Sequence, residues 1–189
     1  MVSRSLAIVA PALILTGCAA SARLSELETL LAAQDSATAA LEQWCARRGL
    51  ADPPTIRAVP AAPDAAPPAP PGDARALLEA DAHEALAYRH VELTCGETVL
   101  SVAHNWYVPA RLTGPMNAAL AESEASFGKV AAPLAYRRER LDSIEGAGPG
   151  CPAGTVLTHR ALLRLPDSRP LALLVECYTE ANLRPDPAG

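Results

Sequence analysis

The sequence predicts an α+β fold in which an antiparallel β-sheet of about six strands carries helices packed on one face. Apolar residues recur with a helical period from Ser21 to Arg48, so the chain should open with helix. From Tyr88 onward, runs rich in β-branched and aliphatic residues come in pairs joined by short turns, as in hairpins. Because helices and strands do not alternate strictly, a doubly wound nucleotide-binding fold is disfavoured.

Two helices are expected before residue 50. The pair Asp35-Ser36 is a suitable N-cap that ends one helix and starts the next, and Gly49 is a suitable C-terminal stop. Both helices carry apolar stripes that should face the core: Leu24, Leu27, Leu30 and Leu31 in the first, and Leu41, Trp44 and Cys45 in the second.

A short strand at Thr55–Val59 precedes a Pro/Ala-rich stretch at 60–72 that should form an extended, exposed loop. Too few residues come before this loop to fold alone, so we expect it to lie inside one domain. Asp73 should cap a short helix that runs to about Leu86.

The chain is organised around a hairpin from Tyr88 to Pro109, with its turn at Gly96-Glu97. In its first strand, alternation places Arg89 on the same face as three apolar residues, Val91, Leu93 and Cys95. An arginine on an apolar face is costly to bury unless an anion meets it. That anion is either another residue or a ligand.

The second half should contain one helix, one turn and three strands. Thr113 should cap the helix, which runs to about Glu122, and Ser126–Lys129 should form the turn. The expected strands are Leu134–Leu141, Thr155–Leu165 and Leu171–Thr179, with an irregular loop at Gly146–Gly154. The last strand is almost continuously apolar and should lie centrally, so a carboxylate near its end, Glu176, is unexpected.

Residues 1–17 have the features of a signal peptide. Arg4 precedes an apolar run from Leu6 to Leu15 that is too short to span a bilayer. The run leads into Thr16-Gly17-Cys18, which resembles the lipobox that signal peptidase II cuts before cysteine. The resemblance implies lipid on Cys18 and one mature domain, 18–189, tethered to the membrane and facing the periplasm. Ala19 favours the outer membrane over the inner one. The alternatives are an ordinary secretory signal and an N-terminal helix retained in the cytoplasm.

Four further cysteines, Cys45, Cys95, Cys151 and Cys177, lack the spacing of a zinc ribbon or a redox C-x-x-C motif. In an oxidising compartment they suggest two disulfides, with three connectivities open. Because Cys45 ends the helical region and Cys95 ends a strand at the hairpin turn, we expect these two to pair. That leaves Cys151 with Cys177.

Several kinds of chemistry are disfavoured. The net charge of −5, without a basic run, argues against nucleic-acid binding. The histidines lack the spacing of metal ligands on one helix, and no Walker loop, G-x-G-x-x-G or G-x-S-x-G motif occurs. Neither a metal nor another cofactor is expected. Paired carboxylates for glycoside chemistry stay open, with nothing pointing to them.

Arg89 and Glu176 therefore stand out as charged residues on separate apolar strands. One interpretation is a structural salt bridge between them. The other is a small polar site in which Arg89 holds a carboxylate and Glu176 accepts from a hydroxyl.

From its first helix almost to its C-terminus, the chain resembles the chorismate lyase family. The resemblance rests on short motifs in a fixed order: Leu30-Leu31, Asp35-Ser36-Ala37-Thr38, the strand pair Arg89–Pro109, Leu112-Thr113-Gly114-Pro115, Phe127-Gly128, Arg160–Leu165, Pro170-Leu171 and Glu176. The same fold is similar to the ligand-sensing UTRA domains of transcription regulators, so the fold alone does not imply lyase chemistry.

In that family the aromatic product is buried, with its carboxylate on the strand arginine and its hydroxyl near the last-strand glutamate. The resemblance therefore assigns ligand binding, and any catalysis, to Arg89 and Glu176. The family's methionine and leucine in the wall of the site fall on Ala37 and Phe127, which alters the wall. An arginine of the second hairpin strand is replaced around Asn105-Trp106.

An active lyase would convert chorismate to 4-hydroxybenzoate and pyruvate. Chorismate is made and consumed in the cytoplasm, whereas the lipobox places this domain outside it. We therefore expect a membrane-tethered domain that binds a small aromatic carboxylate in a buried pocket. An active lyase is the second expectation, and a structural lipoprotein without a ligand is the third.

Overall fold

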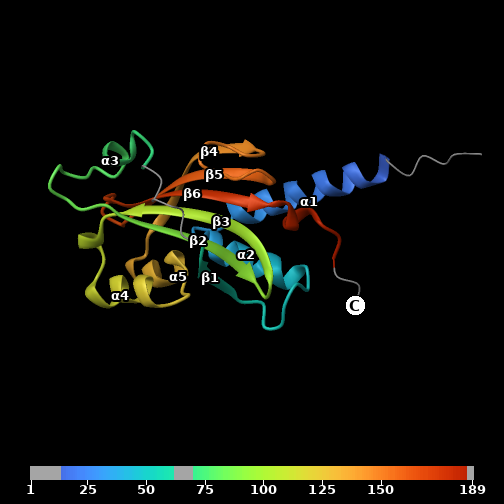
Figure 1. The fold of residues 1–189 in the computed structure, drawn as a ribbon, viewed down its shortest axis with the longest axis horizontal. Coiled ribbons are helices and arrows are strands. Elements are labelled where there is room, and N and C mark those ends of the chain that lie inside the picture. Colours follow the sequence, from blue (N-terminus) through green and yellow to red (C-terminus); the bar gives the residue numbers. More distant parts are fainter. Residues whose placement is uncertain (1–13, 62–69, 187–189) are drawn as a thin grey trace, which may run out of the picture.

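Six antiparallel strands form one sheet, which the longer helices cover from one side (Figure 1). The computed structural model describes residues 14–61 and 70–186. The strands lie in the order β1-β2-β3-β6-β5-β4, and each neighbouring pair is antiparallel. They are β1 (Ile56–Pro60), β2 (Ala87–Cys95), β3 (Thr98–Tyr107), β4 (Arg137–Glu145), β5 (Thr155–Arg164) and β6 (Pro170–Thr179). The predicted α+β class with an antiparallel sheet is therefore confirmed.

The helices in the described part of the chain are unequal in length. They are α1 (Ile14–Ala32), α2 (Ala37–Arg47), α3 (Ala74–Leu77), α4 (Gly114–Glu122) and α5 (Phe127–Ala131), with 3-10 turns η1 (Pro109–Arg111), η2 (Ala132–Leu134) and η3 (Glu180–Leu183). Residues of α1, α2, α4 and α5 pack on one face of the sheet. The short α3 packs on the other face, with Ala74 and Leu78 against Trp106 and Leu173.

The break between α1 and α2 lies at the predicted position. The hydroxyl of Ser36 accepts a hydrogen bond from Ala39 N at 3.3 Å and so caps the start of α2. Gly49 follows the helix with φ +58°, a left-handed conformation that glycine adopts without steric cost. Leu27 and Trp44 are fully buried in the core between these helices and the sheet.

The helix expected from Asp73 to about Leu86 is wrong in length. It ends at Leu77, and the side chain of Asp73 makes no capping hydrogen bond. Glu79 has φ 46°, a left-handed conformation that a helix cannot continue through. The chain from there to β2 is held instead by Arg75, which donates to backbone carbonyls of residues 81 and 84.

Two boundaries near residue 130 also differ from those expected. The stretch Ser126–Lys129, expected as a turn, begins α5, because the Ser126 hydroxyl accepts from Lys129 N at 3.4 Å. The following strand begins at Arg137 rather than Leu134. The 3-10 turn η2 precedes it and is followed by Ala135, its C-cap, which has φ 51°.

β6 lies inside the sheet, between β3 and β5, and its residues from Pro170 to Tyr178 are all buried. Two disulfides tie other segments to the sheet. Cys45–Cys95 joins α2 to β2, and Cys151–Cys177 joins the loop 146–154 to β6. This is the pairing expected from the places of the cysteines at element ends.

The Pro/Ala-rich stretch connects two neighbouring strands of the sheet. β1 precedes it and pairs with β2, which follows it. Residues 62–69 of that stretch, like residues 1–13 of the expected signal peptide, lie outside the described residues. Within the described ranges, no helix combines the length and the apolar character needed to cross a membrane.

Candidate functional site

A cavity of about 30 Å³ lies between the helix-covered face of the sheet and the starts of α2 and α5. Its outer wall comes from residues 35–38 and 126–128. Ala37 and Phe127, the wall positions identified from the sequence, both line it, and Glu176 of β6 lies on its floor. Three of the four predicted ligand-binding residues therefore meet at one cavity.

One end of the cavity is charged. There Arg138 of β4 forms an ion pair with Glu176, and their side chains are 5% and 4% exposed. The same Nη2 atom of Arg138 donates to Nδ1 of His159 at 3.3 Å. The hydroxyl of Tyr178 donates to the glutamate oxygen at 3.2 Å. The buried carboxylate therefore finds its cation on β4, two strands away in the sheet.

Burial and neighbouring charges set the ionisation of this cluster. Burial by itself would lower the pKa of Arg138, but attraction to Glu176 outweighs it, and the pKa is raised overall. Burial lowers the pKa of His159 to about 4, which the glutamate opposes. Burial also raises the pKa of Tyr178 well above its ordinary value, and the glutamate adds to the rise. At neutral pH the ion pair is thus flanked by a neutral imidazole and a neutral phenol.

Arg89 lies on the same face of the sheet, but it is not bound to Glu176. Its Nε donates to Leu120 O at 3.0 Å and its Nη2 to Ser123 O at 3.2 Å, at the C-terminal end of α4. Its Nη1 is buried and has no hydrogen-bond partner among the described residues. Burial lowers the pKa of Arg89, although Tyr107 opposes this. The salt bridge between Arg89 and Glu176 that the sequence left open is therefore wrong.

The strand register gives the separation of these two residues. Arg89 stands opposite Asn105 of β3, which stands opposite Leu174 of β6, two positions before Glu176. With strands ~4.8 Å apart and a rise of ~3.3 Å per residue, the two Cα atoms are about 12 Å apart. Asn105 and Leu174 both line the cavity, whereas Arg89 itself is not among its lining residues.

An open cleft of about 280 Å³ adjoins the cavity on its outer side. The two hollows share the lining residues Asp35, Ser36, Thr38, Gly128 and Tyr136. A Cβ on Gly128 would lie 2.6 Å from Ser36 Oγ and 3.0 Å from the Tyr136 hydroxyl oxygen. That hydroxyl donates to Gly128 O at 3.3 Å. Glycine at this position therefore allows hydroxyl groups from two other elements to approach the backbone.

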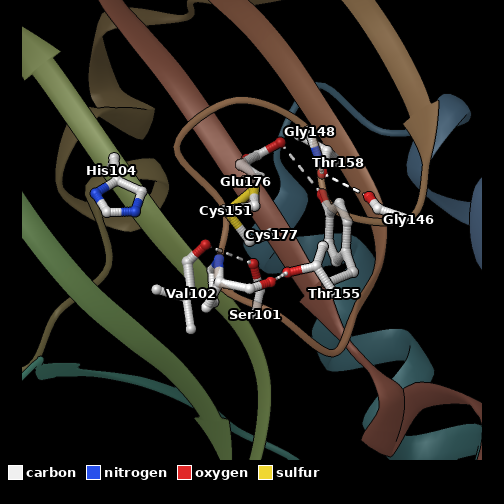
Figure 2. Close-up of a disulfide and its surroundings, with 12 residues drawn as sticks. Ser101, Val102, His104, Gly146, Gly148, Cys151, Thr155, Thr158, Glu176 and Cys177 are labelled. Atoms are coloured by element: carbon white, nitrogen blue, oxygen red, sulfur yellow. Dashed lines mark hydrogen bonds between the residues drawn. A yellow bond between two sulfur atoms is a disulfide. The ribbon is translucent and has the colours of Figure 1, made fainter.

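The Cys151–Cys177 disulfide supports the site from the opposite face of the sheet (Figure 2). Successive residues of a strand point to opposite faces, so Cys177 anchors β6 directly behind Glu176. The loop that carries Cys151 is also held by the Thr158 hydroxyl, which accepts from one backbone N–H at 2.9 Å and donates to one carbonyl at 2.8 Å. The β6 backbone is thus restrained on one face of the sheet by the disulfide of Cys177 and on the other by the ion pair of Glu176.

No pattern in the sequence singles out Arg138, His159 or Tyr178 as site residues. Arg138 is one of several charged residues on a strand that is mostly exposed, and no local pattern distinguishes it. It is buried because β4 lies beside β5, which lets its side chain reach across His159 to the carboxylate on β6. Alternation along β4 was the one usable signal, because it places Arg138 on the face opposite to Arg137.

A curated protein of Sinorhizobium fredii (strain NBRC 101917 / NGR234), described as uncharacterized protein y4mC, is 35% identical over 178 aligned residues. The alignment covers 85% of this chain and 75% of that protein. The chain belongs to the y4mC family. No family model matches the chain.

Several solved structures resemble this fold in part. YydK of Bacillus subtilis, described as a possible transcriptional regulator, is 13% identical with a TM-score of 0.43, over 64% of this chain and 57% of its own. The effector domain of PhnF from Mycobacterium smegmatis is 15% identical with a TM-score of 0.42, over 56% and 70%. A GntR-family regulator of Enterococcus faecalis V583 is 8% identical with a TM-score of 0.44, over 64% and 92%. Each likeness covers only part of the chain.

Proposed function

We propose that this domain binds a small organic acid at the cavity, with the ligand carboxylate at Arg89 and a ligand hydroxyl at Glu176. The observation that carries the proposal is the Nη1 atom of Arg89, a buried cationic donor without an acceptor among the described residues. Leaving a buried donor unsatisfied costs roughly 1–3 kcal/mol, and more when it is charged. A ligand carboxylate is the acceptor that a guanidinium matches best.

The lining of the cavity favours a flat, largely apolar body, and the walls must move apart to admit one, because the cavity is about 30 Å³. Ala37 and Phe127 form one wall, and Val91 and Leu174 lie on the floor. Glu176 is held in place by its ion pair and by a phenol, so it can accept a further hydrogen bond from a ligand hydroxyl. The Cα atoms of Arg89 and Glu176 are about 12 Å apart by strand geometry, with apolar side chains between them, and two long polar side chains across this span suit a hydroxybenzoate-like acid.

Isothermal titration calorimetry with 4-hydroxybenzoate tests this proposal. We expect saturable binding by the wild type, and Arg89→Met should weaken it at least about tenfold while changing the melting temperature little. Arg57→Met is the matched control, because Arg57 is half exposed on β1 and pairs with Glu124. Absence of binding by folded wild-type protein, or equal losses in both variants, would contradict the assignment.

The chorismate lyase resemblance makes catalysis the competing function, and a direct assay separates the two. Chorismate is incubated with the protein, and released pyruvate is detected with lactate dehydrogenase. We expect binding without turnover, because the proposed site holds an acid without requiring a reactive conformation. Saturable pyruvate release by the wild type that is lost in Arg89→Met would replace the binding function with a lyase.

We also propose that lipid on Cys18 tethers the domain to the cell envelope, on its periplasmic side and at the outer membrane. Cys18 is exposed, and the first half of α1 extends away from the sheet (Figure 1), which suits an anchor. Cys18→Ala should release the protein from membranes or leave an uncleaved precursor, as fractionation and mass spectrometry would show. Wild-type protein found in the cytoplasm with Met1 intact would refute the tether. An active chorismate lyase would then become the first expectation for the function.

A further inference from the structure

The two disulfides differ in how far the solvent reaches them. Cys45, Cys95 and Cys177 are each 0% exposed, whereas Cys151 is only partly buried. Cys151 also lines an open cleft of about 470 Å³, together with Val102 of β3. Val102 stands opposite Cys177 in the sheet, so the cleft lies on the face that carries the disulfide (Figure 2). Of the four bridged cysteines, Cys151 is therefore the one that a molecule outside the protein can approach.

We propose that the Cys151–Cys177 disulfide is a thiol-exchange site, which a protein with a C-x-x-C dithiol reduces by attack on Cys151. Reduction releases residues 149–154 from β6. Thiol–disulfide exchange requires a thiolate to reach one of the two sulfur atoms, so it depends on access, and exposed disulfides are more labile than buried ones. This inference does not depend on the proposed ligand, which would bind on the opposite face of the sheet.

The exchange takes two steps and balances without another reagent. A thiolate of the dithiol bonds to the sulfur of Cys151 as the disulfide breaks, and Cys177 leaves with the electron pair and takes up a proton. The second thiol of the reductant then attacks its own sulfur in the mixed disulfide, which releases Cys151 as a thiol. Two electrons and two protons pass to the cysteine pair, and the reductant ends as a disulfide.

A dithiol suits this site better than a monothiol such as glutathione. After the first step Cys177 stays close to the mixed disulfide, because β6 is paired on both sides. Its thiolate can attack Cys151 again and restore the original bond. A dithiol competes with this reversal, because its own second thiol is also held next to the mixed disulfide, and a monothiol has no such group.

The disulfide attaches residues 149–154 to the sheet. The Thr158 hydroxyl holds the earlier part of the loop through two hydrogen bonds. In the part of the chain that the structure describes, the hydrogen bonds of residues 149–154 stay within the loop or reach only Thr155 beside it. Breaking the disulfide therefore leaves this segment without a covalent or hydrogen bond to β6.

The released segment covers apolar surface of β6. A Cβ on Gly150 would lie 4.0 Å from Val175 Cγ1, so the loop passes directly over this side chain, which is 4% exposed. Cys177, two positions further along the same face, is 0% exposed. A second cleft, of about 200 Å³, reaches Val175 from the other side of the loop, past Pro149. Reduction should uncover this part of β6 between the two clefts.

Differential alkylation of the purified full chain, with both disulfides formed, tests the inference. The reductant is a thioredoxin with an intact C-x-x-C motif, and mass spectrometry follows the thiols that appear at each cysteine with time. We expect Cys151 and Cys177 to be reduced at least about a hundredfold faster than Cys45 and Cys95. The buried pair is the matched control, because its bond becomes accessible only when the fold opens. Glutathione at the same thiol concentration should give at least about tenfold less net reduction.

The point of attack and the release of the loop have their own readouts. A thioredoxin whose second active-site cysteine is replaced by serine should stay attached to Cys151, because it cannot resolve the mixed disulfide. After reduction by intact thioredoxin, peptides covering 149–155 should exchange their amide hydrogens at least about tenfold faster, while those of β2 stay unchanged.

Several results would overturn the inference. They are attachment of the serine variant of thioredoxin through Cys177, reduction of both disulfides at the same rate, and no reduction of protein that circular dichroism shows to be folded. Equal net reduction by glutathione would refute the dithiol partner. Unchanged hydrogen exchange at 149–155 after reduction would refute the release of the loop.

Discussion

Replacing Arg138 by methionine should destabilise this protein far more than removing any exposed arginine. The substitution keeps a long apolar side chain but removes the cation that Glu176 faces in the core. The glutamate would keep only the hydroxyl of Tyr178, at 3.2 Å. Both partners of the ion pair are about 95% buried, so water cannot replace the lost charge without opening the fold.

The magnitude follows from that burial. Breaking a buried ion pair by removing one partner costs roughly 3–5 kcal/mol, a large part of the ~5–15 kcal/mol that a domain has in total. Glu176→Gln should cost a similar amount, since it leaves the guanidinium without its anion. The double variant removes both buried charges, so it should recover at least about 2 kcal/mol relative to the sum of the single losses.

Urea unfolding followed by circular dichroism, with the disulfides intact, measures all three free energies of unfolding. Arg164→Met is the matched control on the neighbouring strand. Its ion pair with Glu139 is 31% and 51% exposed, so we expect a loss of at most about 1 kcal/mol. If Arg138→Met costs no more than this control, or if the losses of the two single variants simply add in the double variant, the buried pair is not coupled as described.

Three further predictions concern stability. Burial lowers the pKa of His159 from 6.5 to about 4, so the unfolded chain binds a proton more readily, and up to about 3 kcal/mol should be lost as the pH falls from 6.5 toward 4. Gly128→Ala should cost about 1 kcal/mol, because a Cβ 2.6 Å from Ser36 Oγ displaces the cap of α2. Replacing Cys45 and Cys95 together by alanine should cost about 4 kcal/mol in the chain-entropy model, because their disulfide spans a separation of 50 residues.

Each of these predictions has its own control. In His159→Asn, which keeps an acceptor for Arg138, the acid-induced loss should be smaller than in the wild type, and an unchanged pH profile would contradict the assignment. Gly114→Ala should be neutral or stabilising, because nothing lies within 4 Å of its Cβ position. Equal effects at the two glycines would refute the role of the cap. If the melting temperature does not fall when Cys45 and Cys95 are replaced, this disulfide does not stabilise the protein by lowering the conformational entropy of the unfolded chain.

Much of the architecture could be predicted because its signals are local. The break at Asp35-Ser36, the stop at Gly49 and the cap at Thr113 depend on side chains within a few residues of the helix end. The central place of the last strand followed from its continuous apolar run. The helix after Asp73 was predicted too long, because the left-handed turn at Glu79 that ends it has no glycine or proline to mark it.

The sequence by itself determined that Arg89 shares a strand face with apolar residues, because alternation along a strand depends only on the residues of that strand. It also showed that Glu176 ends a continuous apolar run. The family resemblance suggested Ala37 and Phe127 as wall positions through the motifs around them. Only the tertiary structure decided which charges meet. Arg138 reaches Glu176 across β5, from 38 positions earlier in the chain, because the sheet order places β4 and β6 on either side of that strand. Local patterns cannot report such a contact, since its two partners are brought together by strand pairing rather than by spacing in the sequence.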